Sequence, residues 1–229
     1  MFSSIDGIKY HGSWLNNMQH GKGEEEWPDG TKFVGEFQHG KKTGKGQFRW
    51  PDGSTYQGEV VDNKLHGYGT YTWAVEGRVY AGYWSKNCMH GQGILEYADG
   101  RIYHGSFAKG KKHGNGSFEW PDNRKYRGHY HSDIKQGYGI FEWPDGRKYI
   151  GQWLNGRQHG QGVYIAPNGK RREGEWCEGK LAHWLVNIEV EEPCHDAADD
   201  GNFMEAEVED SGTNIAKGDS ASRKEIAGT

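Results

Sequence analysis

The stretch from Phe33 to Thr55, FVGEFQHGKKTGKGQFRWPDGST, decides the fold, because the same 23-residue pattern returns along most of the chain. Its first residue is an aromatic anchor, called position 0 here, and equivalent anchors follow at intervals of 23 residues, with one interval of 24. The anchors are Tyr10, Phe33, Tyr56, Tyr80, Tyr103, Tyr126 and Tyr149, and Arg172 takes their place in a partial last copy. A fixed period of this length indicates a repeat architecture.

Each unit has the pattern of a β-hairpin. Positions 0 to 4 follow aromatic-x-Gly-x-aromatic, and positions 11 to 17 follow Gly-x-Gly-x-aromatic-x-aromatic, as in Gly44–Trp50. A polar stretch separates the two runs, and three of the seven full units close on Pro-Asp-Gly, as at Pro51–Gly53, while the others close on variants of it. Because proline presets φ and glycine accepts a positive φ, this tripeptide predicts a tight turn. Two short runs separated by turn residues predict a pair of antiparallel strands.

The alternation of side chains along a strand predicts one aromatic face. We expect position 4 to pair with position 11 across the polar turn, position 2 with 13, and position 0 with 15. The anchor face then carries positions 0, 4, 15 and 17, where 24 of 28 residues are aromatic, beside glycines at positions 2, 11 and 13. The rings should lie over bare glycine backbone, and polar side chains should cover the opposite face.

Successive hairpins are expected to join into an all-β fold, an elongated single-layer antiparallel β-meander. About sixteen strands spaced about 4.8 Å apart would give a sheet roughly 75 Å long. Such a sheet twists with a fixed hand, so we expect a gutter-like ribbon. No hairpin of this size is stable alone, so contacts between neighbouring units must supply the stability.

Composition predicts two regions that meet near Trp184. Residues 1–184, the repeat array with seven full repeats from Tyr10 and a partial eighth, carry 25 Lys and Arg against 20 Asp and Glu. Residues 185–229 carry 3 against 12. A change of sign this sharp indicates a boundary. We expect a capping strand or short helix around GKLAHWLVNIEV, followed by an acidic tail that is disordered.

The sequence shows no signal for membrane insertion, secretion or disulfide formation. It has no run of 18 apolar residues, the length that a membrane-spanning helix needs. The first residues, MFSSIDGIKY, contain no apolar leader. The three cysteines, Cys88, Cys177 and Cys194, do not suggest a disulfide framework. We therefore expect a cytoplasmic protein.

The repeat resembles a known family. Units such as Phe33–Phe37, followed in most copies by His-Gly-x-Gly and then by Pro-Asp-Gly or a variant of it, resemble the MORN (membrane occupation and recognition nexus) repeat. The resemblance covers residues 10–184, and Arg172 departs from it by replacing the anchor aromatic. It implies a single-layer β-meander. Proteins built only from such arrays include scaffolds of cilia, radial spokes and parasite cytoskeletons. Other arrays occur in junctional membrane proteins, or beside catalytic domains in lipid kinases and a histone methyltransferase.

We expect no enzymatic activity, cofactor or metal. The 45 residues after the repeats are too few for an appended catalytic domain, and no catalytic set stands out from the repeat pattern. Five histidines share position 10: His20, His66, His90, His113 and His159. Equivalent residues of successive hairpins lie two strand spacings apart, roughly 10 Å, which is too far to share a zinc ion. The histidines are instead expected to close the polar turns by hydrogen bonds.

The aromatic face is the strongest functional signal. A single-layer sheet leaves such a face open in part, and exposed aromatic surface usually marks an interaction site. We expect a groove that binds a helical or extended segment of a protein partner. The resemblance places this scaffold in a cytoskeletal complex, such as the radial spoke of a ciliary or flagellar axoneme. The predicted groove residues are Tyr10, Trp14, Trp27, Phe33, Phe37, Trp50, Tyr56, Tyr71, Trp73, Tyr80, Trp84, Tyr97, Tyr103, Phe107, Trp120, Tyr126, Tyr130, Trp143, Tyr149 and Trp153.

Basic residues in the turns suggest an alternative function. Lys111, Lys112, Arg147 and Lys148 could bind anionic phospholipid head groups, which would make the chain a peripheral membrane tether. Nucleic acid is not expected as a partner, because a net charge of +5 over residues 1–184 falls short of a strongly basic footprint. The unpaired edges of so long a sheet would also allow self-association, as a homodimer or end to end.

Overall fold

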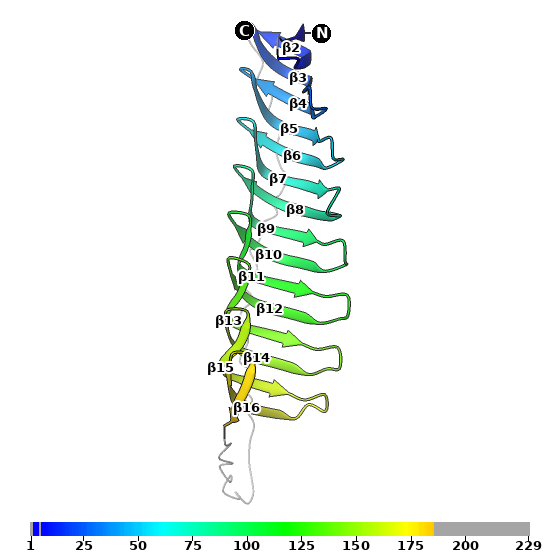
Figure 1. The fold of residues 1–229 in the computed structure, drawn as a ribbon. Helices are drawn as coiled ribbons and strands as arrows, with labels where there is room; N and C mark the ends of the chain where they lie inside the picture. The colour runs from blue at the N-terminus through cyan, green and yellow to red at the C-terminus, as the bar shows by residue number, and fades with distance from the viewer. Residues whose placement is uncertain (1, 5, 186–229) are drawn as a thin grey trace, which may run out of the picture. The chain divides into compact units, whose positions relative to one another are not determined.

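The computed structural model describes residues 2–4 and 6–185, and every regular element within them is a β-strand. Each strand pairs antiparallel with its neighbours in the chain, which forms one open meander (Figure 1). This confirms the predicted all-β fold. The seventeen strands are β1 (Phe2–Ser3), β2 (Lys9–Leu15), β3 (Met18–Glu26), β4 (Lys32–Gln38), β5 (Lys41–Arg49), β6 (Thr55–Val61), β7 (Lys64–Trp73), β8 (Arg78–Ser85), β9 (Cys88–Glu96), β10 (Ile102–Ala108), β11 (Lys111–Glu119), β12 (Lys125–His131), β13 (Ile134–Glu142), β14 (Lys148–Leu154), β15 (Arg157–Ile165), β16 (Arg171–Cys177) and β17 (Lys180–Trp184).

The sheet belongs to the first of two compact units, residues 1–188. The second unit, residues 189–229, contains the predicted acidic tail and lies outside the described residues. Of the two forms expected for the capping segment, its described part takes the strand form, as β17, which pairs with β16. Within the described residues there is no helix long and apolar enough to cross a membrane.

The Pro-Asp-Gly tripeptides form tight turns between successive hairpins, as predicted. Between β5 and β6, the backbone N–H of Gly53 donates a hydrogen bond of 3.0 Å to the carbonyl oxygen of Trp50, and Gly53 has a φ of 85°. The carboxylate of Asp52 accepts a 2.8 Å bond from the backbone N–H of Ser54. Asp and Gly therefore act together, since the first caps the turn and the second supplies its positive φ.

A thin core of aromatic rings runs along one face of the sheet. All seven anchor side chains are 0–1% exposed. Tyr126 lies over Gly128 and Gly139, and its hydroxyl donates a 3.1 Å hydrogen bond to the carbonyl oxygen of His129. The hydroxyls of the other five anchor tyrosines donate the equivalent hydrogen bond to the backbone carbonyl oxygen of the residue three positions later in the sequence. The covered glycines pair with one another from strand to strand and form a continuous row from Gly12 to Gly174.

The register changes at position 11 in the long strands. Positions 0 and 2 pair with positions 15 and 13 as predicted, but Trp14, at position 4, lies opposite Gln19, at position 9. Gly21, at position 11 with a φ of 68°, pairs instead with Phe37 of the next repeat. The predicted pairing of positions 4 and 11 within one hairpin is therefore wrong. A β-bulge, which glycine permits through its positive φ, moves that pairing to the following strand.

Hydrogen bonds join the tips of neighbouring hairpins. The backbone N–H of Asn63 donates to the carbonyl oxygen of Lys42 at 3.1 Å, and its side-chain oxygen accepts from the backbone N–H of Lys42 at 2.8 Å. Asn87 and Asp133 bond to the repeats before them in the same way. The side chains of the five position-10 histidines make no hydrogen bond among the described residues, and His20 Nδ1 is buried without a hydrogen-bond partner there, so the prediction that these histidines close the turns is wrong. Asn and Asp can make these bonds between repeats because they tolerate the left-handed backbone conformation at the tip of the hairpin.

Candidate functional site

The twenty predicted groove residues fall into a buried layer and an outer layer. The buried members are at most 6% exposed, so they form the core and offer almost no surface to a partner. They are Tyr10, Phe33, Phe37, Tyr56, Tyr80, Trp84, Tyr103, Phe107, Tyr126, Tyr130, Tyr149 and Trp153. Trp14, in the first hairpin, is 45% exposed. The remaining members, which are half-buried, are Trp27, Trp50, Tyr71, Trp73, Tyr97, Trp120 and Trp143.

The rings at position 17 form what we call the outer aromatic row: Trp27, Trp50, Trp73, Tyr97, Trp120 and Trp143. Rings at position 15 link its members. Trp50 stacks on Phe48 at 5.4 Å between centroids and lies 5.0 Å from Tyr71 of the next repeat. Trp120 lies 5.8 Å from Phe141 in the same manner. Half-buried tryptophans held by neighbouring rings are typical of protein interaction surfaces.

The side chain at position 9 fills the space between the rings of neighbouring repeats. Residues directly opposite in a sheet share a face, so the pairing with position 4 turns position 9 toward the rings. Leu65 is buried there, and Met89 packs against the core. Sequence reasoning placed this residue in the polar turn. The signal that could have located it is the presence of Leu and Met at a position that elsewhere holds Lys or Gln. The residues are Gln19, Lys42, Leu65, Met89, Lys112, Lys135, Gln158 and Leu181.

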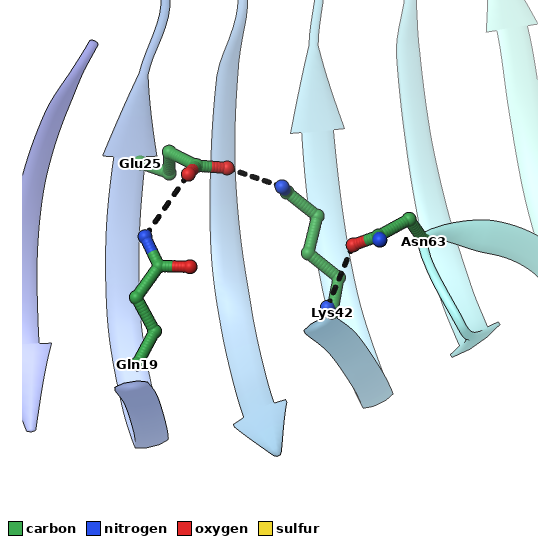
Figure 2. Close-up of polar contacts among 4 residues, drawn as sticks. All are labelled: Gln19, Glu25, Lys42 and Asn63. Atoms are coloured by element: carbon green, nitrogen blue, oxygen red, sulfur yellow. Dashed lines mark hydrogen bonds and ion pairs between the residues drawn. The ribbon is translucent and has the colours of Figure 1, made fainter. Parts of the chain in front are cut away.

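A buried ion pair interrupts the aromatic face near its N-terminal end (Figure 2). The ammonium of Lys42 binds the carboxylate of Glu25, and both side chains are about 90% buried. Gln19 donates a 3.0 Å hydrogen bond to the other carboxylate oxygen. The ammonium also lies 4.4 Å from the centroid of the Trp27 ring. Glu25 replaces a ring at position 15, and the lysine provides the charge that makes its burial tolerable.

Lys112 occupies the equivalent place in a later repeat. Its ammonium donates a 3.2 Å hydrogen bond to the hydroxyl of Tyr97 and lies 3.4 Å from a carboxylate oxygen of Asp133. The side chain is only 14% exposed. Lys112 was expected among the lipid-binding residues of the turns, but the structure directs it inward to the aromatic face.

The other residues predicted to bind lipid lie at the surface. Arg147 donates a 2.6 Å bond to Asp145, and its guanidinium lies over the Trp143 ring. Lys148 pairs with Glu142 at 3.4 Å. Lys111 is exposed and has no carboxylate partner within the described residues. Most of the positive charge expected to face a membrane is therefore compensated within the sheet.

Lys135 lies among four aromatic rings and has no carboxylate partner in the described part of the chain. Its ammonium lies 4.5 to 4.9 Å from the ring centroids. The rings belong to Trp120, Tyr126, Phe141 and Trp153. Burial lowers the pKa of the Lys135 ammonium to about 8, and the positive charge of Arg124 adds to the shift. The rings attract the cation, but they supply no counter-charge.

The opposite face is less uniformly polar than predicted. Tyr68 and Tyr83 are about half exposed there and form an edge-to-face pair with centroids 5.6 Å apart. Tyr68 lines a shallow depression of about 550 Å³, together with Val34, Gln57 and the backbone of Gly58 among others. Tyr138 is exposed on the same face and lines a second depression nearer the C-terminal end of the sheet, together with Ile150 and Val163. Sequence reasoning missed these rings because they stand at positions 3 and 12, which vary between repeats.

A family model described as MORN repeat matches the chain seven times. The matched segments are residues 10–32, 33–55, 56–78, 80–100, 103–123, 126–146 and 149–171. They begin at the seven anchors, so the model and the hairpins of the structure divide the chain at the same points. Among curated proteins, none matches the chain.

Solved structures show only a distant likeness. The TCP domain of Drosophila melanogaster SAS-4, in complex with a proline-rich motif of Ana2, is 16% identical, with a TM-score of 0.46. That match covers 76% of this chain and 93% of that one. The TCP10c domain of Drosophila melanogaster Sas-4 is 14% identical, with a TM-score of 0.40, and the match covers 67% and 91% of the two chains. These scores are too low to support any inference about function.

Proposed function

The chain belongs to the MORN repeat family, and we propose that it is a non-enzymatic scaffold that binds a protein partner along its aromatic face. The outer aromatic row carries this proposal. Its six rings are half-buried, follow one another across the repeats and have no second layer of described residues above them. Their large, rigid side chains can contribute much binding energy at low cost in conformational entropy.

The partner segment is proposed to be helical or extended and to lie across the strands. Equivalent rings recur at every second strand, about 10 Å apart, so a segment of three or four turns of helix could contact several of them. The buried anchor rings hold the row in place and do not touch the partner. The setting, a cytoplasmic cytoskeletal complex such as a ciliary or flagellar radial spoke, rests on the resemblance to repeat-only scaffolds.

Proximity labelling with the full chain would identify the partner, and calorimetry would then measure the affinity. Replacing both Trp120 and Trp143 with Ala should weaken binding at least tenfold, since hot-spot tryptophans contribute about 2 kcal/mol or more each. Tyr138→Ala, on the opposite face, is the matched control and should change the affinity less than twofold. Circular dichroism should show that both variants remain β-rich. Equal affinity of the double variant and the parent chain would refute the proposal.

Lipid binding through the turns has weaker support, because only Lys111 of the four predicted residues is exposed without a carboxylate partner within the described range. It predicts co-sedimentation with phosphoinositide vesicles that weakens with salt and on Lys111→Glu. No sedimentation at low salt would exclude it.

A further inference from the structure

The three lysines at position 9 share one place in the aromatic face but differ in their counter-charge. Lys42 has Glu25, and Lys112 has Asp133 together with a tyrosine hydroxyl. Lys135 has neither among the described residues, although four rings surround its ammonium. At position 9, two lysines thus have a carboxylate partner from the chain, and the third, Lys135, has none within the described residues.

No oxygen of the described residues accepts a hydrogen bond from the Lys135 ammonium. An ammonium has three N–H donors and needs oxygen acceptors. Phenylalanine and tryptophan rings offer no oxygen, and the hydroxyl of Tyr126, which donates to the carbonyl oxygen of His129, makes no hydrogen bond with the Lys135 ammonium within the described residues. Tyr130, which pairs with Lys135 in register, has a buried hydroxyl that also has no partner within the described residues.

The charge around Lys135 is positive. Arg124, whose guanidinium lies over the Trp120 ring, is the nearby charged group that disfavours the protonated amine. Asp122 is engaged in a 2.7 Å pair with the same arginine. The Lys135 ammonium would therefore attract an anion that approaches it. The half-buried site would strengthen that attraction, because fewer water molecules screen it.

We propose that Lys135 is the docking point for a carboxylate side chain of the protein partner. This rests on the proposed function above and adds the chemistry of the partner segment. The segment would carry an Asp or Glu directed at the Lys135 ammonium and apolar residues that contact Trp120 and Trp143. Glu25 supplies the template, since its carboxylate lies beside the Lys42 ammonium within the same kind of aromatic surroundings.

The partial exposure of Lys135 makes this arrangement accessible from outside. Lys42 is closed off by Glu25 and cannot take a second carboxylate. Lys112 is likewise occupied by groups of this chain. The preference should therefore be local. A carboxylate should bind at Lys135 and should not bind at Lys42 or Lys112.

The test uses the full chain, labelled with ¹³C at the lysine ε-carbons, and the small carboxylate 3-phenylpropionate as the probe. The Lys135 signal is identified by its loss in Lys135→Met. At pH 7 the probe should shift this signal in a saturable way in the millimolar range and leave the signals of Lys42 and Lys112 in place. The neutral isostere 3-phenylpropionamide should shift it at least tenfold less, and circular dichroism should show that Lys135→Met remains folded.

Three results would overturn the inference. The first is the absence of a saturable shift at Lys135, and the second is an equal shift with the amide. The third is a shift produced by inositol bisphosphate and not by the carboxylate, which would assign the site to a phosphate. None of them depends on the partner, so the scaffold proposal would still be judged by the Trp120 and Trp143 variants. Once a partner is known, Lys135→Met should weaken its binding about tenfold, and neutralising the contacting acid should have no further effect in that variant.

Discussion

The ring of Tyr126 lies so close to Gly139 that a methyl group on the glycine would be 2.5 Å from the tyrosine hydroxyl oxygen and 2.7 Å from a ring carbon. Neither neighbour can move freely. The ring is fully buried, and its hydroxyl is fixed by the bond to His129. Ring and glycine therefore form one structural unit, and the same relationship recurs at the other anchors.

Gly139→Ala should destabilise the sheet by about 3 kcal/mol, because the added methyl group forces the buried ring out of its place. Urea denaturation followed by circular dichroism measures the change. Arg127→Ala, an exposed position on the opposite face of the same hairpin, is the control and should shift the free energy of unfolding by less than about 0.5 kcal/mol. Equal urea midpoints for Gly139→Ala and the parent chain would contradict the close fit.

The ion pair of Glu25 and Lys42 should be costly to break and easy to replace. Lys42→Ala leaves a buried carboxylate without a counter-charge, which typically costs about 3 to 5 kcal/mol. The double change Glu25→Phe with Lys42→Leu copies the arrangement of Phe48 and Leu65 one repeat later. It should restore the free energy of unfolding to within about 1 kcal/mol of the parent, since well-packed apolar residues often substitute for a buried ion pair. A double variant as unstable as Lys42→Ala would show that the pair is needed for the local register.

The stability of the chain should depend on pH through Lys135. Its pKa falls from 10.5 to about 8 in the folded state, so between these values the unfolded chain binds more protons. The free energy of unfolding therefore gains from this group as pH rises from about 8 toward 10, and below pH 8 the folded state bears the full cost of the buried charge. Lys135→Met should be more stable than the parent at pH 7, and the difference should narrow by pH 9.5. Urea denaturation at both pH values measures it; a difference independent of pH would contradict the shift.

The anchor tyrosines should resist ionisation in the folded sheet. Burial raises the pKa of the Tyr149 hydroxyl to about 12 and raises those of Tyr56, Tyr80, Tyr103 and Tyr126 further. Unfolded tyrosines ionise near pH 10, so the free energy of unfolding should decline above that value. Absorbance at 295 nm should show fewer ionised tyrosines at pH 11 in the native chain than in urea. Complete ionisation of all 13 tyrosines without loss of β-structure would contradict the burial.

The sequence predicted the features that the repeat imposes on every copy. Anchors such as Tyr56 and Tyr103 recur with their glycines, and alternation alone places ring and glycine on one face. It did not predict the bulge at glycines such as Gly21, because a register shift depends on backbone angles that periodicity does not encode. That omission also misplaced Lys112, which a lysine-rich turn suggested was solvated.

The remaining differences come from positions that vary between copies. Tyr68 and Tyr83 are exposed on the opposite face, where the pattern averaged over the repeats shows mostly polar residues. Glu25 and Lys42 meet across two adjacent repeats, and no other repeat places a Glu opposite a Lys at these positions, so the repeat pattern does not reveal the pair. The candidate groove was therefore predicted as a set of rings, but its division into core and outer row required the side chains to be placed.

The continuous row of paired glycines has a further consequence for how such a chain can change in length. Excising residues 80–102 would remove one anchor interval and bring β10 against β7, with each ring, glycine and turn meeting an equivalent of its former neighbour. Insertion of a duplicated unit would be accommodated in the same way. Recombination can thus lengthen or shorten this protein in whole units, so the span between the ends of the sheet is open to selection independently of its folding.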